Sequence, residues 1–337
     1  MYRPAWWVPG RHLQTIWGKF APRTGGGATH IERWDTPDDD FLDIHRLDPP
    51  VAAPRTRPRL VLLHGLEGSP RSHYVRSFLA EATRRGWAAD VIVFRSCGSE
   101  LNRAKRFYHS GETSDLDFVV RSLAGYEPDR PLVLAGVSLG GNVLLKWLGE
   151  REHDIPPQVA AGSAISVPFD LERGARAIER GFSRVYTRHF LRTLRAKARV
   201  KLARNPGLFE SAALERARSL FEFDDAVTAP VHGFADARDY YRRSSSIHFL
   251  ETIRRPTLLL SAHDDPFLPS AVLDDVARIA RHNPALTVEF HRLGGHVGFL
   301  SGREPWSPRF YAEERSLAYL SSFLLNSSGG FPAISRR

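Results

Sequence analysis

The sequence predicts an α/β fold, with a mostly parallel central sheet that is flanked by helices and interrupted by a helical insertion. Three observations support this prediction. After Pro58, short apolar runs alternate with segments of helical length; an Arg-rich helical stretch then breaks the pattern; and two more apolar runs restore it before the C-terminus. Apolar runs that alternate with helices in this way are typical of a parallel sheet buried on both faces.

The first two strands are expected to form an antiparallel hairpin, because residues 30–34 and 41–47 flank an acidic turn, Asp38-Asp39-Asp40. The parallel part of the sheet is assigned to the apolar runs at 60–63, 89–94, 132–135, 159–167, 257–261 and 286–290. The polar helical stretch begins at Pro168. We therefore expect a core of residues 1–167 and 250–326, a helical insert at 168–249 and a frayed tail at 327–337.

Composition places the chain among globular proteins that carry no disulfide. Hydrophobic residues make up 42% of the 337 residues, which is enough for a sizeable core. The single cysteine, Cys97, excludes an intrachain disulfide and any metal site built from several cysteines. The N-terminal segment lacks the apolar run of a secretory signal, and no segment reaches the roughly 18 apolar residues that span a bilayer. We expect a soluble, cytoplasmic protein.

The positive charge of the chain is concentrated in the insert. The formal net charge is +9, and the segment from Arg173 to Arg204 holds eleven basic residues against one acidic residue, Glu179. Outside this segment the charges nearly cancel, and no nucleic-acid-binding motif is present, so we do not expect a nucleic-acid partner. Arginines recur at every fourth position of the insert: Arg176, Arg180, Arg184, Arg188 and Arg192. They form either a solvated helix face or a surface for anionic lipids or phosphate-bearing substrates.

A candidate nucleophile, Ser138, lies where an apolar run gives way to a helical pattern. It stands in the spacing Gly136-x-Ser138-x-Gly140. A serine on a sharp strand-to-helix turn has a strained backbone, and small residues at both glycine positions avoid clashes. The helix N-terminus that follows favours developing negative charge. The pattern indicates a nucleophilic serine rather than a structural Gly-rich turn.

A serine hydroxyl needs a base that is itself held in place by a third group. In this architecture the acid and then the base follow the serine along the chain, each after a late strand. His296 lies in a Gly-rich loop after the run at 286–290 and is the candidate base. His263 and His291 lie in or beside strands, where a packed or surface histidine is the simpler interpretation.

The candidate acid follows the run at 257–261, where Asp264 and Asp265 are adjacent. We favour Asp265, because an Asp-x-x-x-Pro turn that ends at Pro269 is suited to present the carboxylate, while Asp264 could cap the turn instead. A metal site at His263, Asp264 and Asp265 is weakly supported, since no second histidine stands at ligand spacing.

Attack on a carbonyl also requires hydrogen-bond donors for the oxyanion. The turn His64-Gly65-Leu66-Glu67-Gly68 follows the first buried strand, where the second donor of this architecture is built. The backbone N–H groups of Leu66 and Leu139 are the candidates, and an ordinary glycine turn is the alternative for the first of them.

These motifs together resemble the α/β-hydrolases and, within them, the YheT-like branch related to the ABHD hydrolases. The branch's signatures are matched by His12-Leu-Gln-Thr15, by His64-Gly-Leu-Glu-Gly68, by Tyr108-His-Ser-Gly-Glu-Thr-Ser-Asp115 and by a long pattern of Asp224, Gly233-Phe234, Asp239-Tyr-Tyr241, Ser245, Ile253, Pro256 and Asp264-Asp265. The resemblance implies a serine hydrolase of carboxylic esters, with Ser138, Asp265 and His296 as its triad and with no cofactor or metal. Relatives often carry glycine where Ser96 and Ser99 stand, so the conformation of that turn is not predicted.

The insert at 168–249 is expected to form a cap that lines an acyl pocket. Two apolar stripes are predicted to face inward: Ile178, Phe182 and Val185, and then Leu191, Leu194 and Ala198. No single substrate-binding residue is assigned, and the apolar face of the cap is the candidate surface. Cys97 is interpreted as a small packed residue, because no paired histidine stands at a motif spacing. His109 and Asp115 could shape the site or pack a helix.

Two other functions use the same features. Acyl transfer, or thioester cleavage, would employ the same triad with a different acceptor or acyl donor, and the motifs do not exclude peptide-bond hydrolysis. A non-catalytic module that binds membrane surfaces through the basic insert is the alternative outside enzymology. Oligomeric state, acyl chain length and head group are not defined by the sequence.

Overall fold

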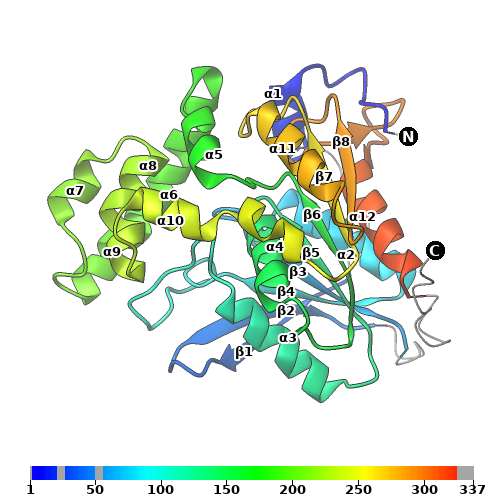
Figure 1. The fold of residues 1–337 in the computed structure, drawn as a ribbon, viewed down its shortest axis with the longest axis horizontal. Coiled ribbons are helices and arrows are strands. Elements are labelled where there is room, and N and C mark those ends of the chain that lie inside the picture. The colour runs from blue at the N-terminus through cyan, green and yellow to red at the C-terminus, as the bar shows by residue number, and fades with distance from the viewer. Residues whose placement is uncertain (1, 21–26, 50–55, 325–337) are drawn as a thin grey trace.

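The structure is a computed structural model that describes residues 2–20, 27–49 and 56–324 (Figure 1). The predicted tail at 327–337 lies outside the described residues. Within them, eight strands form the main sheet in the order β1-β2-β4-β3-β5-β6-β7-β8. The six strands β3 to β8 run parallel to one another, and β1 and β2 form an antiparallel edge in which β2 pairs with β4.

The strand bounds follow the apolar runs of the sequence closely. They are β1 (His30–Asp35), β2 (Phe41–Leu47), β3 (Arg59–Leu63), β4 (Ala88–Val93), β5 (Leu132–Val137), β6 (Val159–Ile165), β7 (Thr257–Ala262) and β8 (Leu286–His291). A short pair, β9 (Leu300–Ser301) and β10 (Arg309–Phe310), follows. The predicted hairpin and the mostly parallel sheet are confirmed.

Helices cover both faces of the sheet and bury its apolar side chains. On one face α2 (His73–Arg85) and α12 (Tyr311–Ser322) enclose a core that includes Phe78 and Leu317. On the other face α3 (Ser114–Tyr126), α4 (Leu139–Arg151) and α11 (Ser270–Ala280) enclose a core with Leu144 and Val276. A short N-terminal helix, α1 (Arg11–Trp17), lies at the same end of the molecule as α11 (Figure 1).

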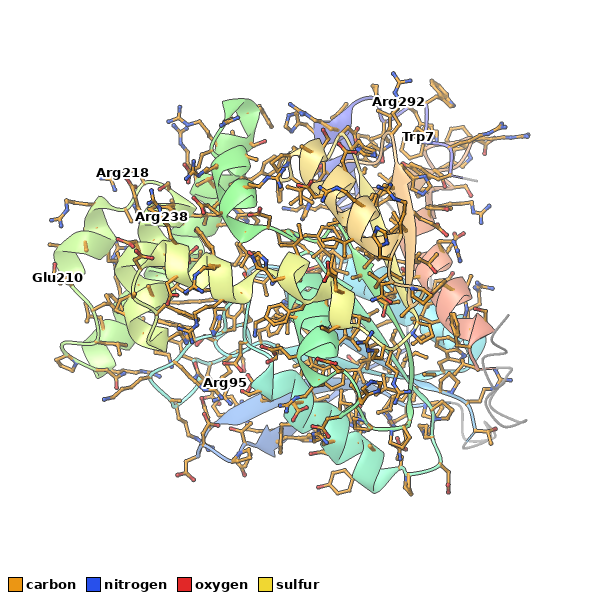
Figure 2. All side chains as sticks on the ribbon, viewed as in Figure 1. Trp7, Arg95, Glu210, Arg218, Arg238 and Arg292 are labelled. Carbon is orange, nitrogen blue, oxygen red and sulfur yellow. The ribbon has the colours of Figure 1, made fainter. Side chains whose placement is uncertain are left out.

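The segment between β6 and β7 is helical and forms a lobe beside the sheet, at the left of Figure 1. Glu210, Arg218 and Arg238 lie on the outer part of this lobe (Figure 2). Its elements are α5 (Leu171–Ile178), η1 (Gly181–Ser183), α6 (Arg184–Arg204), α7 (Ser211–Arg216), α8 (Leu220–Phe223), the π-helix η2 (Asp224–Thr228), α9 (Ala229–His232), α10 (Ala237–Ser244) and η3 (Ser246–Thr252).

The first of the two predicted apolar stripes is wrong. Ile178 is buried at the end of α5, but Phe182 and Val185 are about half exposed, at 54% and 50%. The reason is a break in the helix: Gly181 has φ +54°, so the helical spacing does not continue from α5 into α6. The second stripe is confirmed, since Leu191 and Ala198 are buried and Leu194 packs against the same cluster.

Two lysines of α6 also depart from the expected basic surface, because they point into the core. The Lys197 ammonium lies 2.7 Å from a carboxylate oxygen of Glu67. The Lys201 ammonium donates to the carbonyl oxygens of Asn102, at 2.8 Å, and Ala104. Burial lowers the pKa of Lys201 to about 8. Not all of the charge of the insert therefore faces solvent.

In the described part of the chain, none of the helices combines the length and the apolar character needed to cross a bilayer.

Candidate active site

Ser138 occupies the turn between β5 and α4. Its backbone has φ 54° and ψ −118°, a strained conformation for a residue with a side chain. The helix after it packs closely on the end of β3: a Cβ atom on Gly140 would lie 2.5 Å from the His64 carbonyl oxygen. A side chain at that position would displace the helix, which explains the glycine in the motif. The turn thus presents the Ser138 hydroxyl at the carboxyl end of the sheet.

Three side chains that are far apart in the sequence meet at this point. The Ser138 Oγ lies 3.0 Å from His296 Nε2, and His296 Nδ1 lies 2.8 Å from Asp265 Oδ2. Asp265 and His296 are both buried, at 3% and 8% exposure. The carboxylate fixes the proton of the neutral imidazole on Nδ1, so that Nε2 is left as the acceptor that faces the serine. The structure brings together the serine, base and acid that the sequence singled out.

The two adjacent aspartates have different contacts. Asp265 bonds the imidazole and also accepts the Phe267 N–H at 2.8 Å. Asp264 instead accepts the Gly295 N–H at 2.9 Å, and its pKa is raised by burial. The ring of Phe267 stacks on the His296 ring at a centroid distance of 4.1 Å. Asp264 therefore supports the loop of the histidine, while Asp265 contacts its ring.

The two backbone donors proposed from the sequence lie on either side of Ser138. Leu139 is the first residue of α4, and Leu66 follows Gly65, whose Cβ position would lie 3.3 Å from the Ser138 Cβ. Within residues 2–20, 27–49 and 56–324, no protein acceptor pairs with the N–H of Leu66 or Leu139. Both groups are free to donate to a ligand atom.

His64 braces the Leu66 turn from inside the core. Its Nε2 accepts the Phe94 N–H at 3.2 Å, so the proton is on Nδ1, which donates to the Gly65 carbonyl at 2.8 Å. Full burial lowers the pKa of His64 to about 4, so the ring is neutral at physiological pH. The sequence drew attention to this residue without giving it a role.

Tyr108 holds the same turn from the opposite side. Its hydroxyl accepts the Glu67 N–H at 2.8 Å and donates to the Glu67 carboxylate at 2.9 Å. Glu67 has φ 54° and is paired with Lys197 of α6. These long-range contacts were missed by sequence reasoning, although Tyr108 stands in one of the motifs that carried the family resemblance.

A cavity of about 550 Å³ opens beside Ser138 and His296. The segment between β6 and β7 supplies much of its apolar wall, with Leu171, Ala175, Ile178, Phe190, Leu194, Leu220, Phe223 and Val227. His109, Asp224, His232, Tyr240 and Tyr241 also line it. A cavity of this size, mostly apolar with a few polar groups, suits a small molecule that has an apolar part.

The remaining residues considered from the sequence lie elsewhere or take other roles. Burial raises the pKa of Cys97 to about 11, so it is a protonated thiol and a poor nucleophile. Asp115 is bound by Arg95, which is labelled in Figure 2, at 2.7 Å. The rings of His263 and His291 pack on Phe290 and Tyr2. Of the described residues, no three His, Cys, Asp or Glu side chains are grouped to hold a metal ion.

Comparison with known proteins agrees with this fold. The sequence model of the alpha/beta hydrolase fold matches residues 58–302. The Escherichia coli protein YheT, which carries the name of an esterase, is 39% identical over 315 residues, covering 93% of this chain and 91% of YheT. An esterase structure from Pyrococcus furiosus, 15% identical, has a TM-score of 0.56 over 90% of this chain and 97% of its own, which shows the shared fold.

Two eukaryotic relatives are longer proteins. Monoacylglycerol lipase of Saccharomyces cerevisiae is 30% identical over 79% of this chain and 60% of the lipase. Phospholipase ABHD3 of Mus musculus is 31% identical over 74% of this chain and 60% of that enzyme. This chain thus spans about three fifths of the length of either relative.

The family match and these relatives identify the protein as an enzyme of the esterase and lipase type. The chain belongs to the α/β-hydrolase family and, within that family, to the YheT-like branch.

Proposed function

We propose that the protein hydrolyses carboxylic esters through an acyl-enzyme on Ser138. The observation that carries this proposal is the continuous hydrogen-bond path from the Ser138 hydroxyl through His296 to Asp265, with distances of 3.0 and 2.8 Å. A neutral imidazole with Nε2 toward a serine hydroxyl can act as its general base.

In this mechanism the Ser138 Oγ attacks the ester carbonyl carbon and its proton passes to His296 Nε2. Asp265 stabilises the imidazolium, and the Leu66 and Leu139 N–H groups donate to the oxyanion of the tetrahedral intermediate. The intermediate collapses as the alcohol leaves with the proton from His296. Water then attacks the acyl-serine, with His296 again as base, and releases the carboxylic acid.

We propose that residues 168–249 act as a cap on a core of 1–167 and 250–326, and that the apolar wall of the cavity receives the acyl chain. The lining side chains from α5, α6 and α8 support this role. Relatives named monoacylglycerol lipase and phospholipase favour lipid esters as the substrate class. An acyl-length series of p-nitrophenyl esters would measure how much chain the cavity accepts.

The direct test of the proposal is labelling by a fluorophosphonate, which reacts with activated serines. Wild type should be labelled at Ser138, and Ser138→Ala should not be labelled, because the nucleophile is missing. Absence of labelling in a folded wild type would contradict the enzyme mechanism and favour the non-catalytic membrane-binding alternative. Labelling of Ser138→Ala at another site would place the nucleophile elsewhere.

Acyl transfer to an alcohol is a second candidate activity, since a relative in Saccharomyces cerevisiae, 28% identical, is named an ethyl ester synthase as well as an esterase. Both reactions form the same acyl-serine, and they differ only in the acceptor. Adding increasing ethanol during turnover separates them: an ethyl ester product supports transfer, and acid alone supports hydrolysis.

We also propose that the cap contacts anionic membrane surfaces through its exposed arginines. Arg180, Arg184, Arg188 and Arg192 are exposed, and within the described chain no carboxylate lies within ion-pair distance of any of them. The half-exposed Phe182 and Val185 lie in the same segment. Basic and apolar side chains on one surface are typical of contact with an anionic lipid interface.

Charge reversal tests this contact. The triple variant Arg184→Glu, Arg188→Glu and Arg192→Glu should lose at least about tenfold in activity on esters in phosphatidylglycerol-containing vesicles, because each basic residue near the surface contributes about 1 kcal/mol. Activity on phosphatidylcholine vesicles should be unchanged. Reversal of the exposed Arg254, Arg281 and Arg303, which lie outside the cap, is the control with equal net charge. Equal losses on both vesicle types would contradict the proposal.

A further inference from the structure

The N-terminal motif His12-Leu-Gln-Thr15 lies on α1, outside residues 58–302 that match the hydrolase-fold model. Two of its residues, Gln14 and Thr15, are the buried residues of that helix. Both point at the loop that carries His296. Figure 2 labels Trp7, from the N-terminal segment, and Arg292, from the chain after β8, at the same end of the molecule. The Trp7 indole N–H donates to the Gly302 carbonyl at 3.3 Å, farther along the same C-terminal chain.

We propose that Thr15 is a positioning residue for His296. The Thr15 hydroxyl donates to the Arg11 carbonyl at 2.7 Å, which fixes the direction of its proton. Its oxygen is then free to accept the His296 N–H, which lies 2.9 Å away. A hydroxyl offers one proton and two lone pairs, so both bonds form together. The backbone of His296 is therefore held by a side chain that is 281 residues earlier in the sequence.

Other backbone N–H groups of the loop that carries His296 are bound in the same way, each by one side-chain acceptor from outside the loop. Asp264 accepts from Gly295 at 2.9 Å, Ser166 accepts from Val297 at 3.0 Å, and Gln14 Oε1 accepts from Leu300 at 2.9 Å. Thr15 supplies the contact for His296 itself. Thr15 therefore holds the backbone of His296, the residue whose side chain faces the Ser138 hydroxyl.

The loop needs such anchors because its backbone is strained. Val297 and Phe299 have φ angles of 56° and 41°. Positive φ angles are unfavourable for residues that carry a side chain. Helix α1 also packs closely against Gly295 of this loop. A Cβ atom on Gly295 would lie 2.6 Å from the Arg11 carbonyl oxygen and 2.8 Å from the Thr15 hydroxyl oxygen, so no side chain fits there. Strain of this kind persists only where surrounding contacts determine the conformation, and α1 provides two of them.

Loss of the Thr15 acceptor would leave the His296 N–H unpaired in a buried site and would let the loop relax. Because the imidazole is attached to that backbone, relaxation displaces Nε2 from the Ser138 hydroxyl. A displacement of about 1 Å in such a site can lower the rate by about 100-fold. The inference rests on the proposed triad, in which His296 is the base.

The test compares Thr15→Val, which keeps the shape of the side chain and removes the acceptor, with Thr15→Ser, which keeps the acceptor. Thr15→Val should lower kcat for a p-nitrophenyl ester by about 10- to 100-fold with KM changed less than about threefold, and should shift the acid limb of the kcat/KM–pH profile. Thr15→Ser should restore kcat to within about threefold of wild type.

The control is Thr257→Val, a fully buried threonine of β7 whose hydroxyl donates to the Arg255 carbonyl at 2.8 Å. It should lower the melting temperature without a comparable loss of kcat. If Thr15→Val fails to fold, Thr15→Ala removes the same acceptor without an added methyl group and takes its place. Wild-type kcat and pH profile in the acceptor-free variant would overturn the inference, as would a Thr15→Ser variant no better than Thr15→Val.

Failure of this inference is distinguishable from failure of the proposed function. If Ser138→Ala retains activity, the triad itself is contradicted. If Ser138→Ala is inactive and Thr15→Val behaves as wild type, the triad stands and only the role of α1 is overturned.

Discussion

Ser138→Ala is expected to lower kcat for a short p-nitrophenyl ester by roughly 10⁴- to 10⁶-fold, because no acyl-enzyme can form without the hydroxyl. The oxyanion donors and the cavity remain, so KM should change little. Any residual rate should reflect water activated by His296 and stabilised at Leu66 and Leu139 rather than covalent catalysis.

Steady-state kinetics and a burst measurement on wild type check this prediction together. A burst of p-nitrophenol equal to the enzyme concentration would show acyl-enzyme accumulation. Ser261→Ala, which changes a buried serine of β7, is the control and should keep the wild-type rate. A Ser138→Ala variant within tenfold of wild type would contradict the assignment of the nucleophile.

The pair Asp265→Asn and Asp264→Asn should separate the two adjacent carboxylates. Asp265→Asn is expected to lower kcat by roughly 10³- to 10⁴-fold, because an amide facing Nδ1 favours the wrong tautomer and no longer stabilises the imidazolium. Asp264→Asn should cost less than about tenfold, since the amide oxygen can still accept the Gly295 N–H.

Both variants are measured under the same conditions, with thermal melting to establish that each is folded. The ratio of the two kcat losses identifies which aspartate is the acid. Similar losses in the two variants, or a larger loss in Asp264→Asn, would show that the acid is not Asp265.

Much of the fold was predictable from local sequence, for physical reasons. Parallel strands buried on both faces are continuous apolar runs, so Leu132 to Ala135 and Thr257 to Ser261 are recognisable without any knowledge of their neighbours. Ser138, Asp265 and His296 were also accessible, because each lies in a turn with a distinctive glycine or proline spacing directly after such a run.

The helical insert was less predictable, because helical periodicity holds only while the helix continues. A single glycine with positive φ, Gly181, separated Ile178 from Phe182 and turned the expected inward stripe toward solvent. The inward direction of the Lys197 and Lys201 side chains was equally unpredictable. The sequence does not show that the Glu67 carboxylate and the Asn102 carbonyl lie within reach of their ammonium groups.

The contacts that hold the site had no local signature either. Thr15 and His296, and likewise His64 and Phe94, meet through bonds between a side chain and a distant backbone group. Such bonds impose no periodicity and no spacing on the sequence. The motifs of the family pointed to these residues, but their roles depended on the three-dimensional arrangement.

The anchoring of α6 by Lys197 and Lys201 has a consequence for how substrates are chosen. A helix that an ion pair and two carbonyl oxygens hold to the core is expected to stay in place as a substrate enters. Under the proposed function, the width of the cavity beside α6 would then determine which acyl chains fit. Exchanging Leu194, which lines the cavity, for a smaller or larger residue would change the preferred acyl chain length and leave Ser138, Asp265 and His296 in place.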